Sequence, residues 1–441
     1  MRKALMVILC LTLSFLLLIG CSSTGSNTGS GSGSSNAGSG SGSSSSSASS
    51  TPAEKVTITF LINEAFTRTE EAAVILAAKQ FEEETGIEVV IEPIPSSNLK
   101  EKYTSAALAG GGPDVVMLDT GGWIVDAAAI GIIADLSELI APIASQFQPG
   151  PMQASQFGGK FYAVPWYLNN AGFYYNNDIL SEAGISSVPT TWAEFEEACS
   201  KIQSIGKKSL SIFAKPAYLL YPFFFQNNCS VIDTSKDIPV SVLDTPEALE
   251  AFTFFLDIGM RYNGFPESSK EALTWDQCYA PFIQGECAFM ICGDWGMAPV
   301  SEGNPDLDFG IAPLPIGKTG GTVMGGFSLC INNNSKNFDA AWRFIEFMTA
   351  VEQNDVLLSY GRIGARVDID ATALIDDYPH LEPFVKQAAV TFPRPIVKDL
   401  ADCDDYIAVA FQEVYLDGAD PQEALLRAHE GINKVLIEKY S

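Results

Sequence analysis

The sequence predicts an α/β protein built of two lobes. Strand-like and helix-like segments alternate with short loops from Val56 onward, which is typical of a sheet flanked by helices. The chain has 441 residues, more than one usual domain contains, and 47% of them are hydrophobic, which excludes disorder throughout. We therefore expect a mostly parallel sheet in each lobe and a ligand cleft between the lobes.

The first elements after position 55 set this pattern. A β-branched run predicts a strand, and Thr67 with Glu70 predicts a capping box that opens a helix ending at Gly86. Further hydrophobic runs predict strands over residues 87–94 and 115–118, with a helix over 99–109 between them. The βαβαβ order indicates the start of a doubly wound sheet.

A second α/β region follows. Residues 161–175 are strand-like, Thr191 and Glu194 form a capping box at the start of another helix, and the pattern continues through residues 282–295. Seven cysteines lie in the body, an odd number that argues against a complete disulfide framework, so we interpret most of them as small buried hydrophobic residues. They are Cys199, Cys229, Cys278, Cys287, Cys292, Cys330 and Cys403.

The N-terminus is typical of an exported protein. Two basic residues precede an apolar run over residues 4–19, which is too short for a comfortable membrane span and predicts a signal peptide over residues 1–20. The residues LIGC at 18–21 look like the lipobox of bacterial lipoproteins, which implies that Cys21 is acylated. Residues 21–53 then form a lipidated cysteine and a flexible Ser/Gly tether. Ordinary secretion with a chance cysteine is the alternative.

Charge and motifs exclude several function classes. The 53 acidic and 26 basic residues give a formal charge of −27, which disfavours nucleic acid as a partner and favours a soluble monomer. Gly317-Lys318-Thr319 resembles the end of a phosphate-binding loop, but Ala312 stands where that loop needs glycine. The sequence also lacks the common hydrolase, metalloprotease and dinucleotide motifs. We predict no enzyme activity, no catalytic residue, no cofactor and no metal.

Seven short segments, spread over almost the whole body, carry a family resemblance. They are FEEETGI at 81–87, GPDV at 112–115, GKFYAVP at 159–165, YNND at 175–178, PTTW at 189–192, the segment 282–295 ending in GDW, and WRFI at 342–345. In this order they resemble the bacterial extracellular solute-binding proteins of family 1, the sugar-binding receptors of ABC importers that include maltose-binding protein.

The resemblance implies a two-lobed fold of the type II periplasmic-binding-protein kind. It implies a first lobe of residues 54–166 plus 312–352 and a second lobe of 167–311 plus 353–441, which close on a sugar by a hinge motion. The chain would then be a receptor on the outer side of a bacterial membrane, held by lipid at Cys21, that delivers a carbohydrate to the permease subunits of an ABC importer.

Sugar recognition needs flat aromatic surfaces and planar polar side chains, which sets the candidate residues. Asp294 and Trp295 are the leading pair, because they follow a predicted strand and match the family's stacking tryptophan. Trp123, Trp192 and Trp342 are assigned to packing. The other candidates lie at strand ends, in the segment between the lobes, or in loops at the cleft mouth: Asn63, Glu64, Asp119, Thr120, Trp166, Tyr167, Asn169, Asn170, Tyr221, Gly326, Phe327 and Arg362.

Other functions stay open at this point. A binding protein for a polyamine, metal or peptide would have the same fold. A sensor that presents the sugar to a signalling partner, or a secreted carbohydrate-active enzyme with scattered acidic residues, would also agree with the sequence.

Overall fold

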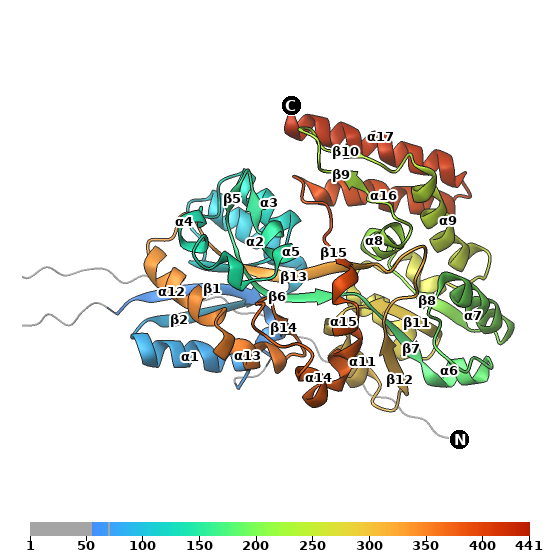
Figure 1. Ribbon diagram of the computed structural model, residues 1–441, viewed down its shortest axis with the longest axis horizontal. Coiled ribbons are helices and arrows are strands. Elements are labelled where there is room, and N and C mark those ends of the chain that lie inside the picture. The colour runs from blue at the N-terminus through green and yellow to red at the C-terminus, as the bar shows by residue number, and fades with distance from the viewer. Residues whose placement is uncertain (1–54, 69–70) are drawn as a thin grey trace, which may run out of the picture. The chain divides into compact units, whose positions relative to one another are not determined.

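The computed structural model describes residues 55–68 and 71–441 (Figure 1). Residues 54–441 form one compact unit by themselves. The predicted signal peptide, Cys21 and the tether lie outside the described residues, as do Thr69 and Glu70 of the predicted capping box. Within the described ranges, no helix has the length and apolar character needed to cross a membrane.

The larger of two main sheets has seven strands. Its order is β14 (Ile363–Gly364), β6 (Val164–Asn170), β13 (Thr322–Ile331), β3 (Val115–Asp119), β1 (Thr57–Asn63) and β2 (Glu88–Ile94), with β15 (Thr391–Phe392) paired to β13. Strands β2, β1 and β3 are parallel to one another, whereas β13 runs antiparallel to both β3 and β6.

The second main sheet has four strands. Its order is β12 (Phe309–Ala312), β7 (Gly172–Asn176), β11 (Cys287–Cys292) and β8 (Lys208–Ser211). Only β11 and β8 pair in parallel, so the expectation of mostly parallel sheets is wrong for both lobes, which have mixed sheets. The reason is that β7 and β13 enter their sheets directly from strands of the other sheet, β6 and β12, without the helical crossover that parallel neighbours need.

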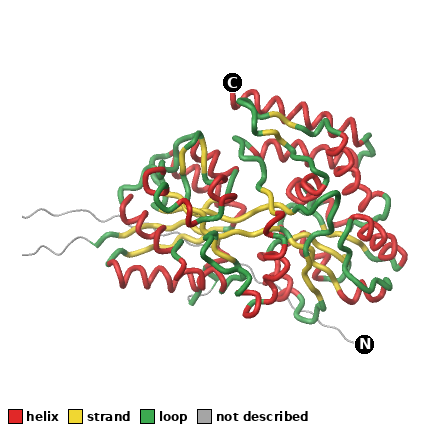
Figure 2. The backbone as a smooth tube through the Cα atoms, in the orientation of Figure 1, coloured by secondary structure: helices red, strands yellow, loops and turns green. Residues whose placement is uncertain are grey.

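Helices cover the two sheets (Figures 1 and 2). Around the larger sheet lie α1 (Ala73–Thr85), α2 (Ser96–Leu108), α3 (Gly122–Ala129), α4 (Ser137–Ile140), α5 (Pro149–Ala154), α12 (Phe338–Met348) and α13 (Asn354–Leu358). Around the smaller sheet lie α6 (Asn177–Glu182), α7 (Trp192–Ser204), α8 (Ala217–Gln226), α9 (Pro246–Met260), α10 (Trp275–Ile283), α11 (Met297–Gly303), α15 (Glu382–Lys386), α16 (Leu400–Tyr415) and α17 (Pro421–Tyr440). The short helix α14 (Leu374–Asp377) stands between α13 and α15 in the sequence.

The helix ends test the local predictions. Helix α1 ends at Gly86, whose φ of 73° is the left-handed conformation that favours glycine, as predicted. Its start is different, because α1 begins after Ala72, and Thr67 instead follows a short 3-10 helix. Thr191 caps α7 as predicted, since its side chain accepts a hydrogen bond from the backbone N–H of Glu194. The seven body cysteines are buried and free.

Two large hydrophobic cores accompany the two sheets. One joins the seven-stranded sheet to α1, α2, α3 and α12, and the other joins β7, β8 and β11 to α7, α8, α9, α16 and α17. Val356, Leu357 and Ala365 belong to the first core, although residues 353–441 were expected in the second lobe. The exact lobe boundaries stay a prediction.

Candidate ligand-binding site

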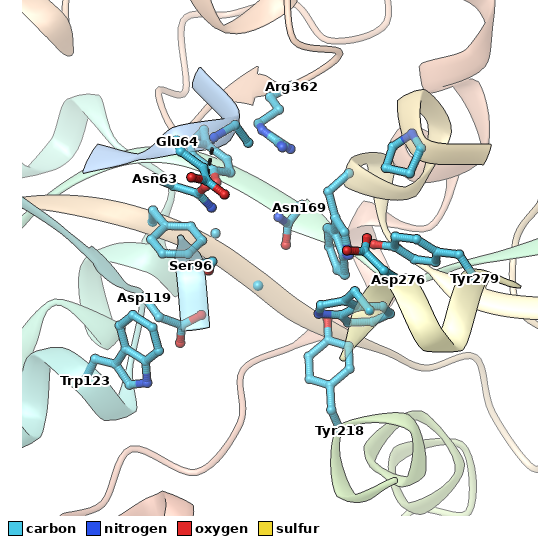
Figure 3. A pocket seen from close by; sticks show the side chains of 18 of the residues that line it. Asn63, Glu64, Ser96, Asp119, Trp123, Asn169, Tyr218, Asp276, Tyr279 and Arg362 are labelled. Atoms are coloured by element: carbon cyan, nitrogen blue, oxygen red, sulfur yellow. Dashed lines mark hydrogen bonds between the residues drawn. The ribbon is translucent and has the colours of Figure 1, made fainter. Parts of the chain in front are cut away.

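A cavity of about 960 Å³ is lined by residues of both lobes (Figure 3). This volume lies in the range of sites that enclose a small ligand. We call it the main cavity. In Figure 3, Asn63, Glu64, Asp119 and Trp123 lie on one side of it, Asp276, Tyr279 and Tyr218 lie on the other, and Asn169 lies between them.

The larger sheet supplies polar side chains to the main cavity. Asn63 and Asp119 are the last residues of β1 and β3, which are adjacent and parallel, so their side chains meet at the same edge of the sheet. Asn63 also fixes the next turn, because its Oδ1 accepts a hydrogen bond of 3.0 Å from the backbone N–H of Ala65. The exposed Glu64 follows directly.

Helix α10 supplies three residues to the opposite wall. A full capping box holds its first turn: Thr274 accepts from the backbone N–H of Gln277, and the Gln277 side chain accepts from the backbone N–H of Thr274. This turn directs Trp275, Asp276 and, one turn later, Tyr279 to the main cavity.

Aromatic rings form a continuous surface on this side. The ring of Trp275 lies 5.7 Å from that of Tyr279 and 5.3 Å from that of Trp295, and Tyr218 lies 6.3 Å from Trp295. A side-chain carbon on Gly293 would overlap the Trp295 indole, so glycine is needed for the ring to lie against the backbone here. The surface is suited to the C–H face of a ring-shaped ligand.

A buried ion pair joins Arg362 to Asp294, the residue before Trp295. Nη1 of Arg362 is 3.3 Å from Oδ1 of Asp294, and the side chains are only 10% and 5% exposed. The Arg362 guanidinium also lies 5.2 Å and 5.1 Å from the ring centres of Phe66 and Tyr167. Burial raises the pKa of Asp294 to about 6, and the attraction of Arg362 offsets part of that rise.

A second ionic cluster joins the two lobes at Asp119. Nη2 of Arg394 donates to Oδ1 of Asp119 at 2.6 Å, and its Nη1 lies 3.8 Å from Asp404 of α16. Asp404 also accepts a hydrogen bond of 2.7 Å from the Tyr221 hydroxyl. Burial raises the pKa of both carboxyl groups, that of Asp404 to about 6, and Arg394 counteracts the rise.

Unpaired polar atoms are concentrated at the main cavity. Seven buried side-chain nitrogen and oxygen atoms in the described part of the chain have no hydrogen-bond partner, and four of them belong to residues that line it. The four are Oδ1 of Asn169, the hydroxyl of Tyr218, Nε1 of Trp295 and Nε of Arg362. Because buried polar groups are normally paired, a polar ligand would complete the hydrogen bonding of these four atoms after a small movement of the side chains that cover them.

The charges of the main cavity nearly balance. Three acidic residues, Glu64, Asp119 and Asp276, face four basic residues, Arg68, Lys215, Arg362 and Arg394. Each basic side chain has an acidic partner within 4 Å. Glu64 and Asp276 have no basic partner within 4 Å among residues 55–68 and 71–441, so the main cavity keeps two carboxylates without a counter-charge. No cluster of three or more potential metal ligands occurs within residues 55–68 and 71–441.

Nine of the fourteen residues predicted from the sequence line the main cavity. They are Asn63, Glu64, Asp119, Tyr167, Asn169, Trp295, Gly326, Phe327 and Arg362. The strand-end argument and the family match therefore led to one common place in the structure.

The other five predicted residues are buried next to the main cavity and bind protein atoms. Asp294 pairs with Arg362, and Tyr221 donates to Asp404. The remaining three also have partners in the protein. Oγ1 of Thr120 lies 3.2 Å from Oγ of Ser328. Trp166 donates to the backbone carbonyl of Met348, and Asn170 donates to that of Phe384.

Sequence reasoning missed several lining residues. Trp123 was assigned to packing, but it lines the main cavity, with its ring 6.3 Å from that of Phe327. Trp275, Asp276 and Tyr279 were not proposed, although the TWDQ run at 274–277 resembles the recognised TWAE capping box at 191–194. Arg394 gave no signal, because its partner Asp119 is 275 residues away.

Acid pH tests the electrostatics of Asp294. Its pKa rises from 3.8 to about 6 on folding, so between these values the folded protein holds a proton that the unfolded chain releases. This group's contribution to stability is therefore full below about pH 4 and is lost as the pH rises through about 6. The loss is about 1.4 kcal/mol for each unit between the two pKa values. The asparagine of Asp294→Asn does not ionise, so the variant lacks this loss. We expect its free energy of unfolding, relative to that of the parent, to increase as the pH rises from 4 to 7.5, and urea denaturation measures both. A difference independent of pH would contradict this.

Comparison with known proteins agrees with this fold. Residues 66–355 match the family model described as bacterial extracellular solute-binding protein, and the chain belongs to this family. The match confirms the resemblance seen in the seven sequence segments.

Individual relatives extend the comparison. A binding protein of Brucella abortus is 26% identical over 375 residues, which cover 81% of this chain and 88% of that protein. The maltotriose-binding protein of Pyrococcus abyssi is 29% identical over 272 residues, 60% of this chain and 56% of that protein. The GacH receptor of Streptomyces glaucescens, solved unliganded and with acarbose, aligns with a TM-score of 0.76 at 24% identity, over 87% of this chain and 99% of that one. This likeness confirms the two-lobed α/β fold.

Proposed function

We propose that the protein is a non-enzymatic receptor that captures a sugar or oligosaccharide in the main cavity. The observation that carries this proposal is the combination of a continuous aromatic surface, Tyr218, Trp275, Tyr279 and Trp295, with unpaired polar atoms in the same cavity. Rings bind the apolar faces of a pyranose, and the unpaired atoms bind its hydroxyl groups. Relatives named for maltotriose and acarbose binding support the same ligand class.

The aromatic surface favours a sugar over the alternatives. The rings of Trp275, Tyr279 and Trp295 lie side by side at the main cavity and offer apolar faces to a pyranose. A polyamine is the second candidate, because Glu64 and Asp276 line the same cavity without a basic partner among the described residues.

Delivery to an ABC importer and anchoring at Cys21 belong to the same proposal. The lobes, 54–166 plus 312–352 and 167–311 plus 353–441, would close on the sugar, and the closed monomer would dock on the permease subunits. Acyl chains on Cys21 would hold the receptor at the outer side of the membrane. Labelling with a radioactive fatty acid in bacteria tests the anchor: the parent should be labelled and Cys21→Ser should not.

A thermal-shift screen of the purified protein tests the ligand class. The panel contains mono- and oligosaccharides, polyamines, peptides and metal ions. A ligand at 100 times its dissociation constant should stabilise the protein by about 2.7 kcal/mol. We expect a clear rise in Tm with one class of glycan. A response only to a polyamine, peptide or metal would overturn the carbohydrate assignment.

Gly325→Ala tests the role of Asn169. A methyl group at position 325 would overlap Oδ1 of Asn169, so the carboxamide would have to move away from its place in the main cavity. We expect glycan affinity to fall by about 1 kcal/mol, the size of one hydrogen bond. Calorimetry of Gly325→Ala, Asn169→Ala and the double variant measures this. Additive losses would contradict a role of Gly325 that acts through Asn169.

A further inference from the structure

A second cavity, of about 400 Å³, lies next to the main cavity, and Trp123 lines both. We call it the side cavity. In Figure 3, Trp123 lies beside Asp119 at one end of the main cavity, away from Asp276 and Tyr279. The side cavity therefore adjoins the end that is farthest from the aromatic surface of α10.

Three segments run from one cavity into the other. On α2, Ser96 lines the main cavity, while Lys100 and Thr104, at spacings of four residues on the same helix face, line the side cavity. On α3, Trp123 lines both cavities, and Ile130, directly after the end of this helix, lines the side cavity. The two cavities therefore share continuous walls.

The third wall is the segment before α16. Arg394 lines the main cavity, and Lys398 and Asp399 line the side cavity. This segment is tied to the first lobe at both places, since Arg394 donates to Asp119 and the backbone N–H of Asp399 donates to Oδ1 of Asp126 at 2.8 Å. The wall is thus held in position along both cavities.

The chemistry of the side cavity suits a neutral, hydroxyl-rich chain. Four of its six charged residues form two ion pairs: Lys100 lies 2.7 Å from Asp126, and Lys439 lies 3.1 Å from Asp399. The other two, Lys398 and Glu438, have opposite charges, and Lys398 donates a hydrogen bond to the carbonyl of Lys439. Trp123 adds an aromatic ring, and Ile130, with 52% of its surface exposed, adds an apolar one. Such a mixture of apolar and paired polar groups resembles the lining of the main cavity.

We infer that the ligand is a linear oligosaccharide whose chain runs from the main cavity past Trp123 into the side cavity. This inference rests on the proposed function and specifies its ligand as a chain longer than the main cavity holds. The units in the side cavity would contact Trp123, the α2 face at Lys100 and Thr104, and the segment at Lys398.

Filling the side cavity tests the inference. Thr104→Phe and Ala129→Phe each place a ring in the side cavity, at a partly exposed and an exposed lining position respectively. Ser105→Phe is the control, because Ser105 is the next residue of α2, is exposed and lines neither cavity. The probes are linear oligosaccharides of two to seven units derived from starch, cellulose, xylan, chitin and mannan. Calorimetry with the purified full chain gives the affinity for each length.

We expect the parent's affinity to rise with chain length within the glycan that binds. The ratio of its affinities for the longest and shortest members should fall about tenfold in Thr104→Phe and Ala129→Phe and stay unchanged in Ser105→Phe. Parent-like ratios in both folded cavity variants would overturn the extension and leave the sugar receptor intact. Failure of the parent to bind any of these glycans would overturn both.

Discussion

Replacing Trp166 by alanine is expected to lower the free energy of unfolding by about 3–5 kcal/mol. Trp166 is 1% exposed, and its indole lies 5.3 Å from the ring of Phe66 and 6.4 Å from that of Phe60. Its Nε1 donates to the carbonyl of Met348 at 3.1 Å, so truncation also leaves a buried acceptor unpaired. Urea denaturation followed by circular dichroism measures the change.

Leu76→Ala is the matched control for this loss. Leu76 lies on α1 of the same lobe, but half of its surface is exposed, so its truncation should change stability by less than about 0.5 kcal/mol. A stability of Trp166→Ala equal to that of the control would contradict the packing role. It would also restore Trp166 as a candidate for direct ligand contact.

Replacing Trp295 by alanine is expected to weaken glycan binding by about 1–3 kcal/mol while the protein stays folded. Trp295 lines the main cavity between Trp275 and Tyr218, and its Nε1 has no hydrogen-bond partner within residues 55–68 and 71–441. The variant loses both a stacking surface and a hydrogen-bond donor for the sugar. Calorimetric titration with the glycan identified by the thermal-shift screen measures the loss.

Trp192→Ala separates binding from the general effect of losing a tryptophan. Trp192 stacks on Phe254, with ring centres 4.1 Å apart, and does not line the main cavity. We expect this variant to lose stability and keep its glycan affinity. Near-normal affinity of a folded Trp295→Ala would remove Trp295 from the site.

The sequence predicted the parts of the site that depend on strand ends. Asn63 and Asp119 could be placed at one edge because β1 and β3 are short hydrophobic runs whose boundaries are visible in the residues. Trp295 could be placed because Gly293-Asp294-Trp295 follows a run that is buried throughout as β11. In these cases a local pattern determined where the side chain lies.

Residues whose place depends on tertiary contacts were harder to predict. Thr120 and Trp166 stand next to lining residues in the sequence, but both are buried. Adjacent residues of a strand point to opposite faces, so Trp166 of β6 turns into the core, and Thr120, in the turn after β3, lies against the buried hydroxyl of Ser328. Arg394 reaches the main cavity from a loop, and only the packing of α16 against the second lobe brings it near Asp119. The mixed sheets arise where the chain passes directly from β6 to β7 and from β12 to β13. A hydrophobic strand pattern does not show in which direction a strand runs within its sheet.

Calorimetric titration of the purified protein with the glycan found in the thermal-shift screen, followed by chromatography of that glycan, tests the central claim most directly. We predict one glycan bound per chain, with the glycan recovered unchanged after prolonged incubation. Shortened glycan products would contradict the receptor and indicate an enzyme. Absence of binding to any glycan, with tight binding of a polyamine, peptide or metal, would contradict the carbohydrate site.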